Sequence, residues 1–261
     1  MTCSLIITTY NWKEALELSI LSALNQSETP DEIIIADDGS REDTRELVQK
    51  YIESSSIPII HSWQEDDGFR LSRSRNVAIS KSKSEYIIVV DGDMILDKNF
   101  VKDHKACAKK GIYLQGSRVL MSEEISAPII KSRKFKEPSI FSDKVKNKHN
   151  MIYAPAFTKL LCKKTTQKLK SVRGCNFSLF KRDIVKVNGF NEDFTTWGKE
   201  DSEFVARLYN VGMRRKNLKF AGIQYHIYHK EGSADDANIQ LLNNTINKNL
   251  KWCDNGIDKY Q

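Results

Sequence analysis

The chain has 261 residues, of which 40% are hydrophobic and 29% charged, and its formal net charge is +7. This length suffices for one large domain with a full core, and no apolar run approaches the roughly 20 residues of a membrane-spanning helix. The positive charge is local, because residues 131–173 hold 13 basic and 2 acidic residues whereas the remainder holds 28 basic and 32 acidic. A membrane-spanning protein and a uniformly basic nucleic-acid-binding protein are therefore disfavoured.

The cysteines and the N-terminus indicate the compartment. The five cysteines are scattered and contain no C-x-x-C pair, so the sequence predicts neither a disulfide framework nor a zinc site. The first apolar run, residues 5–7, is too short for a signal peptide and is expected to lie in a strand. We therefore expect a cytoplasmic protein.

The first half of the chain alternates strands with helices. Strands are predicted at residues 4–8, 32–36, 57–61 and 87–90, and helices at 12–24, through 47–52, and at 71–82. Asn11 with Glu14, and Ser40 with Asp43, have the spacing of a helix cap and its reciprocal acid. Because alternating strands and helices pair in parallel through right-handed crossovers, we expect an open α/β sheet with helices on both faces.

The second half of the chain is less regular. A helix is predicted over residues 97–110 and a strand over 112–120, followed by an irregular or helical basic insertion at 131–173. Beyond the insertion we expect a strand at 174–180, a helix from Trp197 to a stop at Gly212, a strand at 220–226 and a weakly helical tail at 236–252.

Two predicted strands run directly into carboxylates. One precedes Asp91-Gly92-Asp93, and the other precedes Asp37-Asp38-Gly39-Ser40. An Asp-Gly pair is also an ordinary turn signal. However, open α/β sheets bind their ligands outside the carboxyl ends of the strands, where both sets of acids fall. The two boundaries therefore predict one shared site.

Asp91 and Asp93 are candidate ligands of a divalent cation that bridges protein oxygens to substrate phosphates. Two carboxylates seldom complete a coordination shell, and either His226 or His229 could supply a third ligand. Imidazole combined with carboxylates suits Mn²⁺ better than a shell made of oxygen alone. Each histidine could also be an ordinary core or surface residue.

Asp38 precedes a helix without a glycine-rich loop. Neither the G-x-G-x-x-G fingerprint of dinucleotide-binding proteins nor a P-loop occurs in the chain, which disfavours a redox cofactor and an ATPase. Acids after the second strand can instead accept hydrogen bonds from a ribose hydroxyl or a base imide. Asp38 is therefore a candidate nucleoside ligand.

Glu200 and Asp201 stand at the predicted start of a helix, whose partial positive charge stabilises ionised carboxylates. They could be plain N-terminal helix acids. Trp197 and Gly198 lie beside them, and a carboxylate against a flat aromatic side chain indicates a sugar site. A general base at this position would need only to reach a hydroxyl.

Taken together, these motifs resemble those of a family 2 glycosyltransferase of the GT-A fold. The resemblance is carried by Thr8-Thr9-Tyr10-Asn11, Asp37-Asp38-Gly39-Ser40, Asp67-Gly68-Phe69-Arg70, Arg75-Asn76, Asp91-Gly92-Asp93, Gly174-Cys175-Asn176-Phe177-Ser178, Gly189-Phe190-Asn191-Glu192 and Trp197-Gly198-Lys199-Glu200-Asp201. The last segment is similar to one in galactosyltransferases and chondroitin-polymerase-like enzymes. Lys199 replaces the second glycine of the commoner Trp-Gly-Gly-Glu-Asp. The resemblance therefore does not imply a backbone contact with the sugar at this position.

The resemblance implies the fold and its division. The expected fold class is α/β, a GT-A fold with a single open, mostly parallel (mixed) sheet, helices on both faces, a basic insertion and a C-terminal helical tail. One domain would span residues 1–261. Within it, 1–97 would form the nucleotide-binding half, 98–235 the acceptor-binding half with the insertion at 131–173, and 236–261 the tail.

The resemblance also implies roles for individual residues. The donor would be bound by Thr8, Tyr10, Glu14, Asp38, Arg70, Arg75, Asp91, Gly92 and His229. Asp93 and His226 would hold a divalent cation, Mn²⁺ or Mg²⁺, with Asp91 beside them. Asp201 would be the catalytic base and Glu200 would bind the sugar or the acceptor, together with Asn176, Trp197 and Gly198.

The expected function is an inverting, metal-dependent transfer of a hexose or N-acetylhexosamine from a UDP-sugar to a hydroxyl, giving a β-linkage. The acceptor is expected to be a surface glycan, namely a lipopolysaccharide, lipooligosaccharide or capsule, presented as a glycolipid or oligosaccharide. A sugar nucleotidyltransferase and a non-catalytic nucleotide-sugar-binding module are the alternatives.

The basic insertion at 131–173 is expected to attract an anionic membrane surface or a phosphate-bearing acceptor, since each basic residue near such a surface contributes on the order of 1 kcal/mol. A solvated mobile face is the alternative. No nucleic-acid-binding module surrounds the insertion, so no nucleic-acid partner is expected. The protein would then be peripheral at the inner face of the cytoplasmic membrane.

Overall fold

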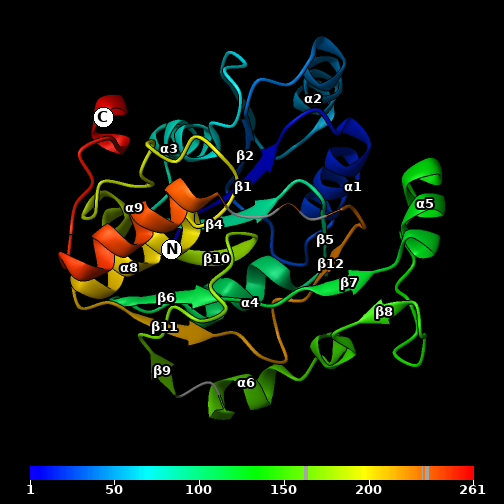
Figure 1. Ribbon diagram of the computed structural model, residues 1–261. Helices are drawn as coiled ribbons and strands as arrows, with labels where there is room; N and C mark the ends of the chain where they lie inside the picture. The colour runs from blue at the N-terminus through cyan, green and yellow to red at the C-terminus, as the bar shows by residue number, and fades with distance from the viewer. Residues whose placement is uncertain (162–163, 231, 233–234) are drawn as a thin grey trace.

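The computed structural model describes residues 1–161, 164–230, 232 and 235–261 (Figure 1). Its helices are α1 (Lys13–Leu24), α2 (Glu42–Ser54), α3 (Leu71–Lys81), α4 (Phe100–Cys107), α5 (Glu123–Ser132), α6 (Pro155–Leu161), α7 (Lys181–Val185), α8 (Glu200–Asn210) and α9 (Asp236–Asn247), with 3-10 turns η1 (Lys148–Met151) and η2 (Ile257–Tyr260). None of the helices in these ranges is long and apolar enough to cross a membrane.

The main sheet is mixed and has eight strands. Its order is β3 (Ile59–Trp63), β2 (Glu32–Asp37), β1 (Cys3–Thr9), β4 (Tyr86–Asp91), β10 (Asn176–Phe180), β6 (Ile112–Gln115), β11 (Arg214–Asn217) and β9 (Thr165–Thr166). The first four strands are parallel, and β10 runs antiparallel to both β4 and β6. The carboxyl ends of β1, β2 and β4 therefore meet at one edge, as the strand-end acids predict.

Helices cover both faces of this sheet because the parallel strands are apolar on both sides. Leu5 of β1 faces a core that contains Leu16 of α1 and Phe100 of α4. The next residue, Ile6, faces a second core that contains Phe204 of α8. Figure 1 shows α1 and α2 on one side of the strands and α3, α8 and α9 on the other. The predicted α/β fold is confirmed.

A second sheet of four strands was not predicted. It consists of β5 (Met94–Leu96), β12 (Gln224–His226), β7 (Val119–Met121) and β8 (Val145–Lys146), and it packs with α1 and α5 around a third core. Two or three residues are too few to show a strand period in the sequence. The expectation of a single sheet is therefore incomplete, and β12 is shorter than the strand predicted at 220–226.

The strand predicted at 112–120 is two strands in two different sheets. Its residues divide into β6 and β7, which are separated by residues 116–118, beginning with Gly116. A Cβ at Gly116 would lie 2.3 Å from the Asn176 side chain, so only glycine allows this close approach. β11 was also missed, because its sequence of two arginines, a lysine and an asparagine has no apolar period.

The predicted helix caps at Asn11 and Ser40 are wrong. Asn11 has φ +48° and its Oδ1 accepts a hydrogen bond from the Arg41 backbone at 3.0 Å, while Ser40 Oγ accepts from the Asn11 backbone at 2.8 Å. Neither α1 nor α2 has a side-chain cap. These side chains instead join the loop after β1 to the loop after β2, which fixes two walls of the cavity described next.

Candidate active site

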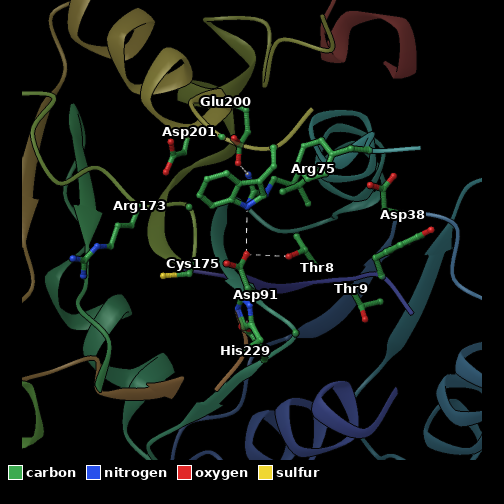
Figure 2. A pocket seen from close by; sticks show the side chains of 18 of the residues that line it. Thr8, Thr9, Asp38, Arg75, Asp91, Arg173, Cys175, Glu200, Asp201 and His229 are labelled. Atoms are coloured by element: carbon green, nitrogen blue, oxygen red, sulfur yellow. Dashed lines mark hydrogen bonds and ion pairs between the residues drawn. The ribbon is translucent and has the colours of Figure 1, made fainter. Parts of the chain in front are cut away.

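A cavity of about 610 Å³ opens at the carboxyl ends of β1 and β4 (Figure 2). The predicted site residues that line it are Thr8, Tyr10, Asp38, Arg75, Asp91, Gly92, Asp93, Trp197, Gly198, Glu200, Asp201, His226 and His229. These residues come from both halves of the chain. The fold therefore brings the strand-end acids and the start of α8 to one space.

Arg75 of α3 is a buried cation in the cavity wall. Its residue is 1% exposed, and its terminal nitrogens lie 3.3 Å from Asp91 Oδ1 and 3.3 Å from Glu200 Oε1. Thr8 Oγ1 donates to the same Asp91 oxygen at 3.1 Å. A Cβ at Gly174 would lie 2.8 Å from Arg75 Nη2, so glycine leaves room for the guanidinium. Figure 2 shows Arg75 between the two carboxylates.

Asp91 is the last residue of β4, and Gly92 and Asp93 form the turn between β4 and β5. A Cβ at Gly92 would lie 2.6 Å from the Thr8 carbonyl oxygen, so the turn can pack against β1 only with glycine here. Burial raises the pKa of Asp91, although Arg75 opposes this shift. The Asp93 carbonyl accepts from the Ile227 backbone at 3.0 Å, which ties the turn to the end of β12.

Asp93 forms a compact cluster with His226, the last residue of β12, and His229, three residues further along the chain. Asp93 Oδ2 lies 3.2 Å from His226 Nε2 and 3.0 Å from His229 Nε2, and the two imidazole nitrogens are 3.2 Å apart. Burial disfavours the ionised Asp93 carboxylate, but the hydrogen bonds to both histidines outweigh burial and lower its pKa to about 2. The bond to Asp93 raises the pKa of His229 to about 9.

This donor set fits a divalent cation. The three ligand atoms lie within 4.8 Å of one another, and Asp93 Oδ1 is buried without a hydrogen-bond partner. One carboxylate and two imidazoles suit first-row divalent metals. Asp91 does not belong to this group, because its Oδ1 is engaged by Thr8 and Arg75. Both histidines contact Asp93, whereas the resemblance implied that His226 is a metal ligand and His229 a donor-binding residue.

Asp38 lies on the side of the cavity opposite Arg173 (Figure 2). Its Oδ1 accepts from Gln64 Nε2 at 2.6 Å and its Oδ2 from the Arg70 backbone at 2.9 Å. Burial raises the pKa of Asp38 to about 6, and these two hydrogen bonds only partly oppose it. Tyr10 is 51% exposed at the rim, where its hydroxyl donates to Asp66 at 3.1 Å. This wall offers a planar aromatic side chain beside a fixed carboxylate.

The loop before α8 is held in an uncommon conformation. Gly198 has φ +100° and Lys199 has φ +75°, so Lys199 occupies the left-handed region at a cost of about 1 kcal/mol relative to glycine. Asn238 of α9 donates to the carbonyls of Thr196, Trp197 and Gly198 at 2.9, 3.3 and 2.8 Å. These bonds keep the loop in place and explain how a lysine is accommodated.

Glu200 and Asp201 begin α8 and point into the cavity with different surroundings. Glu200 is 8% exposed, and its Oε2 is buried without a hydrogen-bond partner. Asp201 is half-buried, and its Oδ1 accepts from the Ser202 backbone at 2.5 Å and from the Ser202 hydroxyl at 3.1 Å. Figure 2 shows Glu200 and Asp201 next to each other, across the cavity from Asp91.

The pKa of Glu200 is raised to about 7, because burial and the neighbouring Asp201 outweigh Arg75. The ordinary pKa of a glutamate is 4.5, and the pKa of Glu200 is higher in the folded chain. The protonated carboxyl therefore stabilises the fold below pH 4.5, and this contribution is lost as the pH rises toward 7. Glutamine stays neutral throughout. The measured quantity is the free energy of unfolding of Glu200→Gln minus that of wild type. Because only wild type loses stability as the pH rises, we expect this difference to increase by roughly 2 to 3 kcal/mol between pH 4.5 and pH 7.

Urea titrations at several pH values measure this difference. Glu123→Gln is the matched control, because Glu123 is exposed at the first position of α5. Its difference from wild type reports the effect of replacing an exposed glutamate at a helix start. A flat difference for Glu200→Gln would show that Glu200 titrates as an exposed carboxyl does.

Glu14 and Arg70, both expected to bind the donor, do not line the cavity. Glu14 lies on α1 with a carboxylate oxygen 3.8 Å from Arg133. The Arg70 side chain is paired with Asp67 at 2.9 Å, and only its backbone contributes, through the bond to Asp38. The spacing along the chain could not show which way these side chains point.

Asn176, expected to contact the acceptor, is a buried structural residue. It is 0% exposed, and its Nδ2 donates to the carbonyl oxygens of Ser117 at 3.0 Å and Gly222 at 3.3 Å. These bonds link β10 to the segments before β7 and β12. Asn176 therefore holds the two sheets together beneath the cavity.

Among the cavity-lining residues that were not predicted as site residues are Trp12, Arg118 and Arg173. Trp12 was predicted as the first residue of a helix, but it directly precedes α1, and its ring contacts His229 edge-on at 5.9 Å between centroids. Its position directly after the Thr8-Thr9-Tyr10-Asn11 motif is a signal that could have revealed it. Arg173 was assigned to the basic insertion, and nothing in the sequence separates it from the other basic residues there.

Two family models match the chain. The model described as glycosyl transferase family 2 matches residues 4–189. The model described as the N-terminal domain of galactosyltransferase matches residues 159–230, which include the start of α8 and both histidines of the cluster. The two matches together cover every residue of the cavity wall.

Curated relatives include synthases of long glycan chains. The chain is 26% identical over 250 residues to the chondroitin synthase of Escherichia coli and 26% identical over 255 residues to a hyaluronan synthase of Pasteurella multocida. The alignments cover 85% and 87% of this chain, but only 34% and 24% of those proteins. The chain thus spans about a third or less of the length of these relatives.

A solved structure shares the fold. The structure of S. aureus TarS 1-349 in complex with UDP-GlcNAc superposes with a TM-score of 0.66 and 17% sequence identity, covering 100% of this chain and 69% of that chain. This similarity concerns the arrangement of helices and strands, which agrees with the α/β architecture in Figure 1.

Proposed function

Because the chain belongs to glycosyl transferase family 2, we propose that it transfers a hexose or N-acetylhexosamine from a UDP-sugar to an acceptor hydroxyl. One observation carries the proposal: a single cavity unites Asp38, the Asp93 cluster and the Glu200–Asp201 start of α8. Residues 1–97 would hold the nucleotide, residues 98–235 the acceptor, and the tail at 236–261 would support α8. The TarS structure with UDP-GlcNAc supports a UDP-sugar as the donor class.

The donor would lie across the carboxyl ends of β1, β2 and β4. Tyr10 and Asp38 offer an exposed ring and a carboxylate to the uridine, and Thr8 and Asp91 lie further along the cavity toward the cluster. Arg75 fixes Asp91 and supplies positive charge near the diphosphate. In this orientation the sugar would reach Trp197, a residue that is 50% exposed.

Asp93, His226 and His229 would hold the divalent cation, for which Mn²⁺ suits the mixed oxygen and nitrogen donors and Mg²⁺ is the alternative. When bound, the cation would supply positive charge that stabilises the leaving diphosphate. The protein's own part is to keep Asp93 ionised and to aim both imidazoles at it, which the bonds of the cluster accomplish.

Replacing Asp93 with asparagine is expected to weaken Mn²⁺ binding by about 10- to 100-fold or more, because the carboxylate is the only anionic member of the cluster. Calorimetric titration of the whole chain with MnCl₂ measures the affinity. Asp97→Asn, beyond the other end of β5, is the matched control and should bind Mn²⁺ as wild type does. Equal affinities for wild type and Asp93→Asn would contradict this metal site.

Asp201 would act as the general base. The acceptor hydroxyl loses its proton to the Asp201 carboxylate while its oxygen forms a bond to the anomeric carbon. The bond from that carbon to the diphosphate oxygen breaks, and its electron pair leaves with UDP. Attack from the face opposite the leaving group inverts the configuration, so an α-linked donor would give a β-linked product. Glu200, held by Arg75, would position the sugar or acceptor.

The basic insertion would bring the protein to its acceptor at the inner face of the cytoplasmic membrane. Ile140 and Phe141, between α5 and β8, are 38% and 90% exposed, and exposed lysines Lys134, Lys136 and Lys146 lie on both sides of them in the chain. An exposed apolar tip with flanking lysines is typical of peripheral binding to anionic lipid. The acceptor would then be a surface glycan built on a lipid.

We expect the protein to bind phosphatidylglycerol-containing vesicles at low salt and to dissociate from them as salt increases. Vesicle co-sedimentation measures the bound fraction. Phe141→Ser should lower it, whereas Phe157→Ser, which changes an exposed phenylalanine of α6, should not. Salt-independent binding, or no binding at low salt, would rule out this membrane surface.

A further inference from the structure

A second cavity, of about 520 Å³, lies between the basic insertion and β11. Its charged lining residues are Lys168, Lys170, Arg173, Arg215 and Lys219, and no aspartate or glutamate of the described ranges lines it. Polar side chains complete the wall, among them Asn147, Asn150 and Asn217. Figure 1 shows β11 and β9 side by side at this edge of the main sheet. The cavity is therefore strongly cationic.

Arg215 is a buried cation without an anion. The residue is 5% exposed, and its terminal nitrogens donate to Gln115 Oε1 at 3.4 Å and to the Lys170 carbonyl at 3.0 Å. Its Nε is buried without a hydrogen-bond partner, and Arg215 forms no ion pair with any carboxylate in the described part of the chain. Burial of a charge is costly unless an opposite charge compensates it. An anionic ligand would supply that charge and the missing acceptor.

The neighbouring charges are arranged for the same ligand. Lys168 and Lys170 are exposed on the segment between β9 and β10, and neither they nor Arg173 pair with a carboxylate among the residues that the structure describes. A guanidinium with flanking ammonium groups is the usual protein site for phosphate and carboxylate. The lysines would admit the anion from solvent, and Arg215 would hold it.

Arg173 connects this cavity to the active site, because it lines both. Figure 2 shows its side chain extending away from Asp91, on the side opposite Asp38. The side of the active site that faces away from Asp38 is the side left for the acceptor. The anion site therefore lies along the path that an acceptor chain would follow out of the active site.

We propose that the cationic cavity binds an anionic group, a phosphate or a carboxylate, of the acceptor chain beside the sugar that is glycosylated. The proposal rests on the proposed transferase function for the identity of the ligand as an acceptor. It specifies the acceptor class, an anionic glycan, and assigns Arg215, Lys168 and Lys170 as specificity-determining residues outside the catalytic cavity.

Anion binding is tested without donor or turnover by titrating the ¹⁵N-labelled full chain with sodium phosphate at constant ionic strength. The Arg215 Nε–H signal and the Ser171 and Arg173 amide signals are expected to shift and saturate. The double variant Lys168→Glu, Lys170→Glu should raise the apparent Kd about tenfold or more. The control Lys109→Glu, Lys110→Glu, with exposed lysines outside both cavities, should not change it.

The outcomes separate this inference from the transferase proposal. Saturable shifts with phosphate or with acetate support the anion site, and their relative strength identifies the preferred anion. Absence of saturable shifts with both anions, or equal Kd values for the double variant and its control, overturns the site even if UDP is released from a donor. Saturable shifts without any UDP release retain the site and contradict the transferase proposal instead.

Discussion

Replacing Asp201 with asparagine is expected to lower acceptor-dependent turnover about 10²- to 10⁴-fold, the usual effect of removing a general base. Asparagine keeps the size of the side chain and can still accept from the Ser202 hydroxyl, so the start of α8 should persist. Affinity for UDP should be unchanged because Asp201 lies across the cavity from Asp38, the proposed uridine ligand (Figure 2). The rate of UDP release and calorimetric UDP binding together measure the two effects.

A matched control removes a carboxylate charge at the start of another helix, outside the cavity. Asp236 lies in the first turn of α9, as Asp201 lies in the first turn of α8, but Asp236 is exposed and does not line the cavity. Asp236→Asn should retain wild-type turnover. Full acceptor-dependent turnover in Asp201→Asn would show that another group accepts the proton.

Replacing Arg75 with methionine is expected to lower the free energy of unfolding by about 3 kcal/mol. Loss of one partner from a buried ion pair costs roughly 3 to 5 kcal/mol. The lower end applies because the Asp91 side chain is 34% exposed and can be partly hydrated. UDP binding should weaken as well, because Asp91 and Glu200 would both lose the cation that orients them. Urea unfolding and calorimetry measure the two quantities.

The double variant Arg75→Met, Glu200→Gln tests the cause of the destabilisation. Removing the charge of Glu200 removes the more deeply buried of the two carboxylates that Arg75 neutralises. The double variant should therefore be more stable than Arg75→Met alone, with a coupling energy of about 1 kcal/mol or more. Strictly additive effects would indicate that Arg75 stabilises the fold by packing alone.

Local sequence patterns were sufficient to predict the fold of the first half of the chain. The buried strand before Asp91 and the acid pair at Asp37 and Asp38 are short-range features whose consequence follows from parallel-sheet topology. The Trp197 to Asp201 segment was similarly informative, because it begins a helix with a strong apolar period. Each of these predictions depends on residues that are neighbours in the chain.

Features that depend on distant contacts were not predictable. Arg75 and Glu200 are 125 residues apart, and no periodicity connects them. The direction of the Asn176 side chain is decided by the carbonyl groups of Ser117 and Gly222, which the second sheet brings to it. The same holds for Arg215, whose strand β11 has no apolar pattern and whose burial results from the insertion that covers it.

The basic insertion shows how composition alone merges separate surfaces. Its lysines near Phe141 are exposed beside an apolar tip, whereas Lys168, Lys170 and Arg173 line the cationic cavity. In the sequence these groups form one run of positive charge. The structure divides them, so a membrane role and an acceptor role concern different residues and can be tested with different variants.

The most direct test of the transferase account is UDP release from UDP-glucose, UDP-galactose and their N-acetyl forms, measured with Mn²⁺, with a chelator, and with the Asp201→Asn variant. The account predicts that at least one donor releases UDP with Mn²⁺, and that the release is lost with the chelator and reduced at least a hundredfold, to order of magnitude, in the variant. Two results would contradict the account. One is that none of these donors releases UDP. The other is that wild type with Mn²⁺, wild type with the chelator and the variant all release UDP at the same rate.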